Sequence, residues 1–126
     1  MRRSIHQKVN TYRRALGKNT LQAKNVFNSI AQEHAEDMAA GRSSFSHNGF
    51  KKRVKKARAY FPQGLTMGEN LYTSNYPVNM QAERCVEGWK DSPGHDKNLR
   101  GNFQYTGIGV ARSRDGHYFI VQIYMK

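Results

Sequence analysis

The last third of the chain contains two runs in which large apolar residues alternate with small or polar ones. These runs, residues 106–111 and 117–124, are separated by the dipeptide Asp115-Gly116. A period of two places successive side chains on opposite faces of a strand, and Asp-Gly is among the best signals for a tight hairpin turn. The sequence therefore predicts that the chain ends in an antiparallel β-hairpin.

The part of the chain that precedes this hairpin has the period of amphipathic helices. A first helix is expected over residues 4–16, with Ser4 and Gln7 as its capping box. Its apolar positions share one face: Ile5, Val9, Tyr12 and Leu16. A longer helix is expected over residues 25–40, ending before Gly41. Its buried stripe is expected to contain Phe27, Ile30, Ala31, Ala35 and Met38.

Four further segments complete the expected secondary structure. A short basic helix is expected to follow Gly49 and to end before Phe61-Pro62, and residues 65–73 are expected to be extended. Apolar residues then recur at helical spacing, at Val78, Ala82, Cys85 and Trp89. Pro93 begins a short helix that reaches Leu99. Helices first and a hairpin last indicate an α+β domain in which helices pack on an antiparallel sheet.

Length and composition limit the class of protein. The 126 residues suit a single domain spanning residues 1–126. No apolar run approaches the roughly 20 residues that a membrane-spanning helix needs. One cysteine, Cys85, excludes an intramolecular disulfide, and its helical position predicts a buried side chain. Met1-Arg2-Arg3 resembles the front of a signal peptide, but no apolar segment follows, so the chain is expected to be intracellular or the mature part of an exported precursor.

A strong positive charge is the clearest compositional feature. The formal net charge is +12, and a block within residues 51–58 holds six of the 21 basic residues. This basic block consists of Lys51, Lys52, Arg53, Lys55, Lys56 and Arg58. Such a block attracts an anionic lipid surface, an acidic cell-envelope polymer or nucleic acid, or it is only a solvated helix face. Sequence-specific nucleic-acid binding is disfavoured, because no aromatic residue lies within the block to stack on bases.

Three short motifs hold the side chains best suited to chemistry. They are Ser46-His47-Asn48-Gly49, Gly68-Glu69-Asn70 and Ser92-Pro93-Gly94-His95. Imidazole and carboxylate groups bind metals and transfer protons near neutral pH, and the glycines and prolines beside them indicate turns. Because the motifs are roughly twenty residues apart, only folding can bring them together into one site.

Taken in order, these motifs and their neighbours resemble a known family. The matching elements are Val9-Asn10-x-x-Arg13, His34-Ala35-Glu36-Asp37-Met38-Ala39, Ser46-His47, Gly68-Glu69-Asn70-Leu71, Gly88-Trp89, Ser92-Pro93-Gly94-His95-x-x-Asn98-Leu99 and Gly107-Ile108-Gly109-Val110-Ala111. The series is similar to the CAP superfamily of cysteine-rich secretory proteins, antigen 5 and pathogenesis-related proteins, also called the SCP domain. It is most similar to the compact bacterial members, and it covers nearly the whole chain.

The resemblance implies a three-layer αβα sandwich with a central antiparallel sheet and a cleft holding two histidines and two acids. His47 and His95 match the two histidines, and Glu69 matches the acid of the Gly-Glu-Asn motif. The second family glutamate corresponds to Ser92, beside Asp91, so one acid is absent or replaced. The family disulfides are absent too. The resemblance also implies a secreted or extracytoplasmic protein, and we expect a monomer.

Metal binding is the first function expected of this site. Two neutral imidazoles are good ligands for Zn²⁺ or a similar divalent cation, with Glu69 and water completing the shell. Occupancy should fall below about pH 6, because imidazoles protonate near pH 6.5. The alternative is that His47 and His95 only hold the loops of the cleft by hydrogen bonds.

Two other functions remain open. A protease-like or esterase-like hydrolase would use His47, Glu69 or His95 with Asp91 and a nearby serine, but the sequence has no Gly-x-Ser-x-Gly motif and no recognisable oxyanion loop. The serines near the histidines are Ser43, Ser46 and Ser92. A binding module is favoured, since CAP relatives bind sterols, fatty acids or phospholipids. The aromatic residues able to line a lipid groove, or else to pack in the core, are Tyr60, Phe61, Tyr72 and Tyr76.

The remaining candidates are assigned structural roles. His34 faces the core from the second helix, His6 lies beside the core stripe of the first helix, and His117 lies beside the hairpin turn. Trp89 is expected in the core, and Asn70 is expected to bind loop backbone. The sequence thus predicts an extracellular CAP-domain binding protein whose cleft holds a divalent cation, with a hydrolase and a basic nucleic-acid-binding protein as alternatives.

Overall fold

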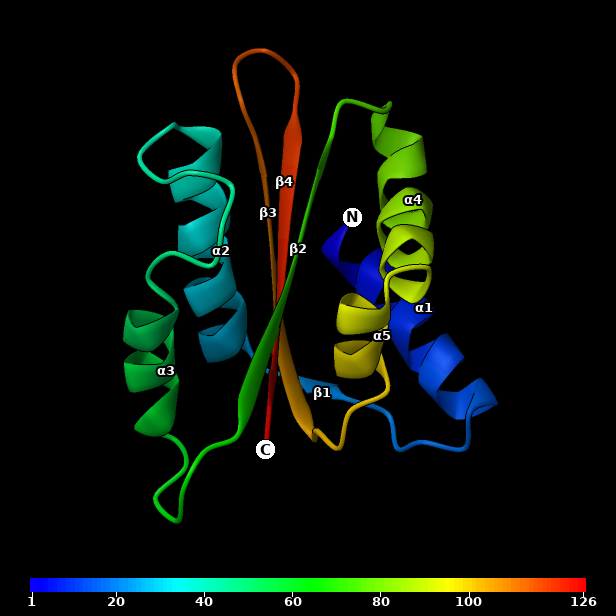
Figure 1. Cartoon of the computed structure of the whole chain (residues 1–126), viewed down its shortest axis with the longest axis vertical. Coiled ribbons are helices and arrows are strands. Elements are labelled where there is room, and N and C mark those ends of the chain that lie inside the picture. Colours follow the sequence, from blue (N-terminus) through cyan, green and yellow to red (C-terminus); the bar gives the residue numbers. More distant parts are fainter.

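The computed structural model describes residues 1–126 and has three layers (Figure 1). The middle layer is a sheet of four strands: β1 (Gln22–Ala23), β2 (Met67–Ser74), β3 (Tyr105–Arg112) and β4 (Tyr118–Met125). Helices α2 (Asn25–Ala39) and α3 (Phe50–Arg58) lie on one side of it. Helices α1 (Arg2–Ala15), α4 (Val78–Lys90) and α5 (Pro93–Leu99) lie on the other. This is the α+β sandwich that the sequence predicted.

The strand order is β1-β3-β4-β2, and β4 pairs antiparallel with both long neighbours. The C-terminal hairpin of β3 and β4 is therefore confirmed, with Gly116 at φ 88° in its loop, a conformation that favours glycine. The expected all-antiparallel sheet needs one correction, because the two-residue β1 pairs parallel with β3. The chain crosses this edge of the sheet at β1. Leu21, just before β1, is buried in the core on one face of the sheet, and Phe27, just after it, is buried in the core on the other face.

Helix α2 lies unusually close to β3. A Cβ atom on Gly107 or Gly109 would overlap backbone atoms of Phe27 or Ala31, so only glycine allows this approach. The side-chain amide of Gln32 then bonds both the N–H and the carbonyl of Val110 at 2.8 Å, beyond the end of β1. Helix α2 thereby covers the open edge of β3, which would otherwise expose unpaired backbone groups.

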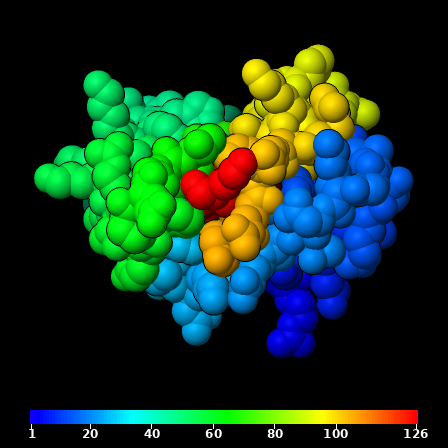
Figure 2. Space-filling model, turned by 90° about the horizontal axis from the view of Figure 1, so that it is seen from below, coloured from blue at the N-terminus to red at the C-terminus, as the bar shows by residue number.

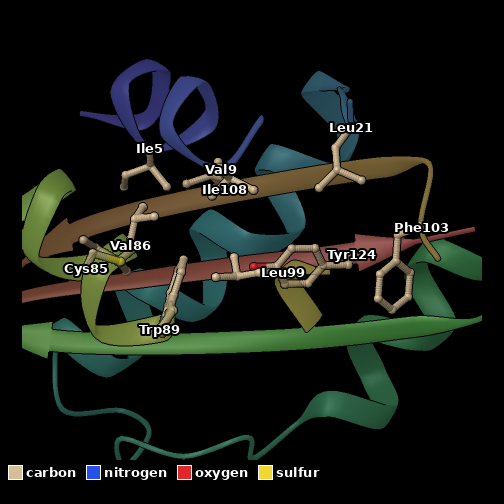
Figure 3. Close-up of a cluster of buried hydrophobic side chains, with 11 residues drawn as sticks. Ile5, Val9, Leu21, Cys85, Val86, Trp89, Leu99, Phe103, Ile108 and Tyr124 are labelled. Atoms are coloured by element: carbon tan, nitrogen blue, oxygen red, sulfur yellow. The ribbon is translucent and has the colours of Figure 1, made fainter. Parts of the chain in front are cut away.

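Two hydrophobic cores fill the spaces between the layers. One lies between the sheet and α1, α4 and α5 and includes Trp89 (Figure 3). Trp89 is 1% exposed and donates from Nε1 to the Leu71 carbonyl at 2.9 Å, and Cys85 is fully buried beside it. Burial raises the pKa of the Cys85 thiol well above its usual value, as befits a packing residue. The other core contains the whole stripe expected on the second helix.

Helix α1 differs from its prediction at both ends. It begins at Arg2 with Met1 as N-cap, and no side chain caps it, so the capping box of Ser4 and Gln7 does not form. Leu16 is exposed, and the face toward the core continues instead through fully buried Arg13. The Arg13 guanidinium donates to the carbonyls of residues 19, 99, 101 and 103 and so ties the end of α5 to the start of the chain.

A membrane-spanning helix is not found among the five helices, since each lacks the length and apolar character that crossing a bilayer requires.

Candidate functional site

The carboxylate of Glu69 is the buried centre of the site. Glu69 lies on β2, and its side chain is 1% exposed. Its oxygens accept hydrogen bonds from Arg53 Nε at 2.6 Å, from Arg53 Nη2 at 2.8 Å and from His47 Nδ1 at 2.8 Å. A buried carboxylate is costly unless it is paired and hydrogen-bonded, and a two-pronged arginine contact satisfies both conditions.

Arg53 also belongs to this site, although the sequence placed it in the basic block of residues 51–58. The prediction that it belongs to an exposed basic block is wrong, because its side chain is only 8% exposed. Besides binding Glu69, its guanidinium donates to the carbonyls of Asn48 at 2.8 Å and His47 at 3.3 Å. On α3, Arg53 shares the inward face with Ala57, four residues later. This helical spacing is the feature of the sequence that could have indicated the burial of Arg53.

The other members of the basic block lie on the exposed side of α3. Lys56 forms an ion pair of 2.8 Å with Glu33 of α2. The rest form no ion pair: Lys51, Lys52, Lys55 and Arg58. A compact set of uncompensated positive charges therefore remains on one side of this helix.

His47 lies in the loop that leads into α3, and its side chain is 57% exposed. Nδ1 donates to Glu69, so in the neutral ring Nε2 carries the lone pair, and Nε2 has no hydrogen-bond partner in the chain. The loop is held from beneath by His34, whose Nε2 donates to the Ser46 carbonyl at 2.8 Å. Burial lowers the pKa of His34, which is the satisfied core histidine that the sequence predicted.

His95 approaches the site from α5. Its Nδ1 pairs with the Ser92 hydroxyl at 2.9 Å, and its Nε2 also lacks a partner in the chain. Burial lowers the pKa of His95, and the charge of His47 lowers it further. His47 and His95 are 48 positions apart in sequence and share no direct hydrogen bond, so this effect on the pKa of His95 is what relates the two imidazoles.

Asparagines attach α5 to the strand that carries Glu69. Asn70, fully buried on β2, donates to the His95 carbonyl at 3.1 Å and to the Tyr124 hydroxyl at 3.0 Å. Asn98 donates to the Asn70 side chain at 2.9 Å and to the Glu69 carbonyl at 3.2 Å. Asn70 therefore binds backbone as predicted, and its role is to set the position of His95. Asn98 was part of a matching motif, but its contacts were not foreseen.

The other predicted site residues lie apart from this group. Asp91 is the exposed C-cap residue of α4, and its carboxylate forms no ion pair. Tyr72 packs against the core that contains Trp89, and exposed Tyr76 stacks beneath the Arg84 guanidinium at 4.5 Å. Tyr60 and Phe61 line a different pocket at the end of the sheet. The four aromatic residues therefore form no single groove.

Few donor atoms at the site remain free to bind a ligand. No group of three or more His, Cys, Asp or Glu side chains is arranged to hold a metal ion. Both oxygens of Glu69, which the sequence predicted as a metal ligand, are already bonded to Arg53 or His47. The atoms left to bind a ligand are Nε2 of His47 and Nε2 of His95.

The molecule is an αβα sandwich with a histidine–glutamate site at the edge strand β2, and these two features together indicate its class. The chain matches the CAP family, described as the cysteine-rich secretory protein family, over residues 6–124. It belongs to this family, and its single cysteine makes it a member without disulfides. No curated protein matches it in sequence.

Solved structures share the fold at low sequence identity. An outer surface protein from Borrelia burgdorferi aligns with a TM-score of 0.77 and 20% identity, over 97% of this chain and 89% of its own. An extracellular SCP-domain protein from Bacillus anthracis gives 0.76 and 23%, over 98% of this chain and 39% of its own. A cysteine-rich secretory protein from Staphylococcus aureus gives 0.75 and 16%, over 98% and 38%. This chain therefore spans less than half of the latter two proteins.

Proposed function

We propose that this protein is an extracellular binding protein whose paired imidazoles, His47 and His95, hold a divalent cation such as Zn²⁺. One observation carries the proposal: each imidazole uses Nδ1 for a contact within the protein, to Glu69 or Ser92, and leaves Nε2 free. Histidines that bind metals are arranged in this way, with the second ring nitrogen held by a carboxylate or another polar group. The location outside the cytoplasm rests on the relatives, which include an outer surface protein and an extracellular protein.

In this arrangement Glu69 orients His47 and fixes its tautomer. Arg53 compensates the buried charge of Glu69, and both oxygens of the carboxylate are engaged in hydrogen bonds. Two protein ligands leave the remaining coordination positions to water or to a group on a partner. The bound cation would be exchangeable and would link the protein to an anionic ligand, in contrast to a structural zinc site.

Zinc titration by calorimetry tests this proposal. The wild-type protein should bind one equivalent, and His47→Ala or His95→Ala should weaken binding by about tenfold or more, since even losing a supporting contact costs that much. His117→Ala is the matched control, because His117 is another partly exposed histidine and lies in the hairpin loop. Equal loss in the control, or no loss in either site variant, would refute the proposal.

The same variants separate a cation site from a hydrolytic one. The Ser92 hydroxyl lies 2.9 Å from His95 Nδ1, and His47 is backed by a carboxylate, so nucleophilic hydrolysis is a rival use of these groups. Turnover of peptide or ester substrates that disappears in both Ser92→Ala and His95→Ala would favour the hydrolase. Zinc binding without such turnover would favour the binding protein.

A second candidate function is attraction to an anionic surface through α3. The unpaired cations on α3 and the net charge of +12 favour a lipid surface or an acidic cell-envelope polymer. Cosedimentation with anionic vesicles or with teichoic-type polymer should decrease as salt rises. Replacing Lys51, Lys52 and Lys55 by Gln should weaken it, whereas replacing Lys8, Lys18 and Lys97 should have less effect. Equal effects of the two triple variants would show that only total charge matters.

A further inference from the structure

A pocket of about 490 Å³ opens at the end of the sheet and is separate from the histidine site. Figure 2 looks onto this end, where the segment after α3 (green), the start of β3 (orange), the last residues (red) and the segment before α2 (light blue) meet. None of the residues that line this pocket belongs to the site around Glu69. Its volume falls within the usual range for sites that bind small organic molecules, roughly 300–1,000 Å³.

Aromatic rings form the wall of this pocket. Phe27 and Phe61 are stacked with ring centroids 5.8 Å apart, and Tyr60 meets Phe27 edge-on at 5.8 Å. Tyr105 completes the set at 5.9 Å from Phe61. Phe27 is buried in the core, so the wall is anchored, while Tyr60 is 54% exposed and turns toward solvent. Such a wall offers ring faces and edges to a flat apolar molecule at little cost in side-chain entropy.

The charged residues at the rim of the pocket indicate which polar group its ligand should carry. Two lysines, Lys24 and Lys126, line the pocket, and no acidic side chain does. Lys24 Nζ lies 5.9 Å from the centre of the Tyr105 ring and forms no ion pair. The side-chain amides of Gln63 and Gln104 add hydrogen-bonding groups to the same lining. A cation beside an aromatic wall suits a molecule with a ring at one end and an anionic group at the other.

We propose that this pocket binds a small aromatic carboxylate, with its ring against Tyr60 and Phe61 and its carboxylate near Lys24. This binding does not depend on the cation site, because the two sets of residues do not overlap. The pocket gives the protein a second ligand of a different chemical class from a metal ion.

Titration of the ¹⁵N-labelled protein with 2-naphthoate tests this site. Saturable shifts should be confined to the backbone amides of residues 24–27, 60–61, 63–64 and 104–105. The neutral analogue 2-naphthalenemethanol has the same ring system and should bind about two- to fivefold more weakly, the usual value of one exposed cationic contact. Shifts spread over the lysine-rich surface, or equal binding of the acid and the alcohol, would overturn the proposal.

Matched variants sharpen the test. Tyr60→Ser should weaken naphthoate binding by about threefold or more, because it removes one ring from the wall. Tyr76→Ser, which changes another exposed tyrosine outside the pocket, should leave binding unchanged. Lys24→Gln should abolish the preference for the acid over the alcohol, and Lys55→Gln should not. Unchanged binding in Tyr60→Ser with its native Tm preserved, or equal loss in Tyr76→Ser, would contradict the assignment.

Discussion

The guanidinium of Arg53 holds the carboxylate of Glu69 through two hydrogen bonds, of 2.6 and 2.8 Å. Both side chains are almost completely buried. The same guanidinium also binds the carbonyls of His47 and Asn48, so one ion pair connects β2 to the loop that carries His47. The basic helix α3 is therefore part of the site's framework as well as a charged surface.

Arg53→Met should lower the free energy of unfolding by about 3–5 kcal/mol, because it leaves the Glu69 charge buried without its partner. Urea denaturation would measure the loss. Lys52→Met, at the neighbouring exposed position on α3, should change stability by no more than about 0.5 kcal/mol. The double variant Arg53→Met/Glu69→Gln should lose less than the sum of its two single variants, since the pair is coupled. A loss below about 1 kcal/mol in Arg53→Met would mean that the ion pair does not form in solution.

His47→Ala and His95→Ala should leave the fold intact, because His47 is largely exposed and His95 lies in a short helix at the rim of the sheet. His34→Ala should lower the free energy of unfolding by about 1–3 kcal/mol, because it leaves the Ser46 carbonyl without its buried donor. Thermal unfolding of the three metal-free variants gives the comparison. A drop of several degrees for His47→Ala or His95→Ala that matched the His34→Ala drop would identify the two site histidines as structural supports.

The metal-free protein should become less stable as the pH falls below about 6.5. Burial is the main cause that lowers the pKa of His6, His34 and His95 from the usual 6.5. The unfolded chain therefore binds protons that the native protein binds less readily, and this contribution to stability is complete above pH 6.5 and lost as the pH drops through the lowered values. Urea denaturation in EDTA at pH 7.5 and 5.5 would measure it. Equal or greater stability at pH 5.5 would count against the burial of these rings.

Gly109→Ala should destabilise the protein by about 1–3 kcal/mol or more, because the added methyl group would push α2 away from β3. Gly94→Ala is the matched control, since a Cβ there meets nothing within 4 Å. Chemical denaturation of the two variants measures the difference. Similar stabilities for both would show that α2 does not approach β3 as closely as described.

Local patterns in the sequence were sufficient for much of the fold. The alternation in residues 106–124 predicted the β3–β4 hairpin, and the spacing of Phe27, Ile30 and Ala31 predicted the buried face of α2. The helical spacing of Cys85 and Trp89 likewise predicted their burial. Each of these features follows from hydrophobic periodicity, which depends only on neighbouring residues. The capping box of Ser4 and Gln7 failed because α1 extends back to Arg2, where the backbone continues the helix without a side-chain cap.

The sequence by itself determined which residues have the chemistry of the site, because imidazole and carboxylate groups are visible in the order of the chain. Only the tertiary structure decided that Arg53 leaves its basic neighbours and turns inward to Glu69, and that Nε2 remains free on both His47 and His95. Six of eight consecutive residues are basic in that segment, and their charge alone does not distinguish which of them is buried. That choice depends on a carboxylate 16 positions away, which α3 meets only after it has packed beside the sheet.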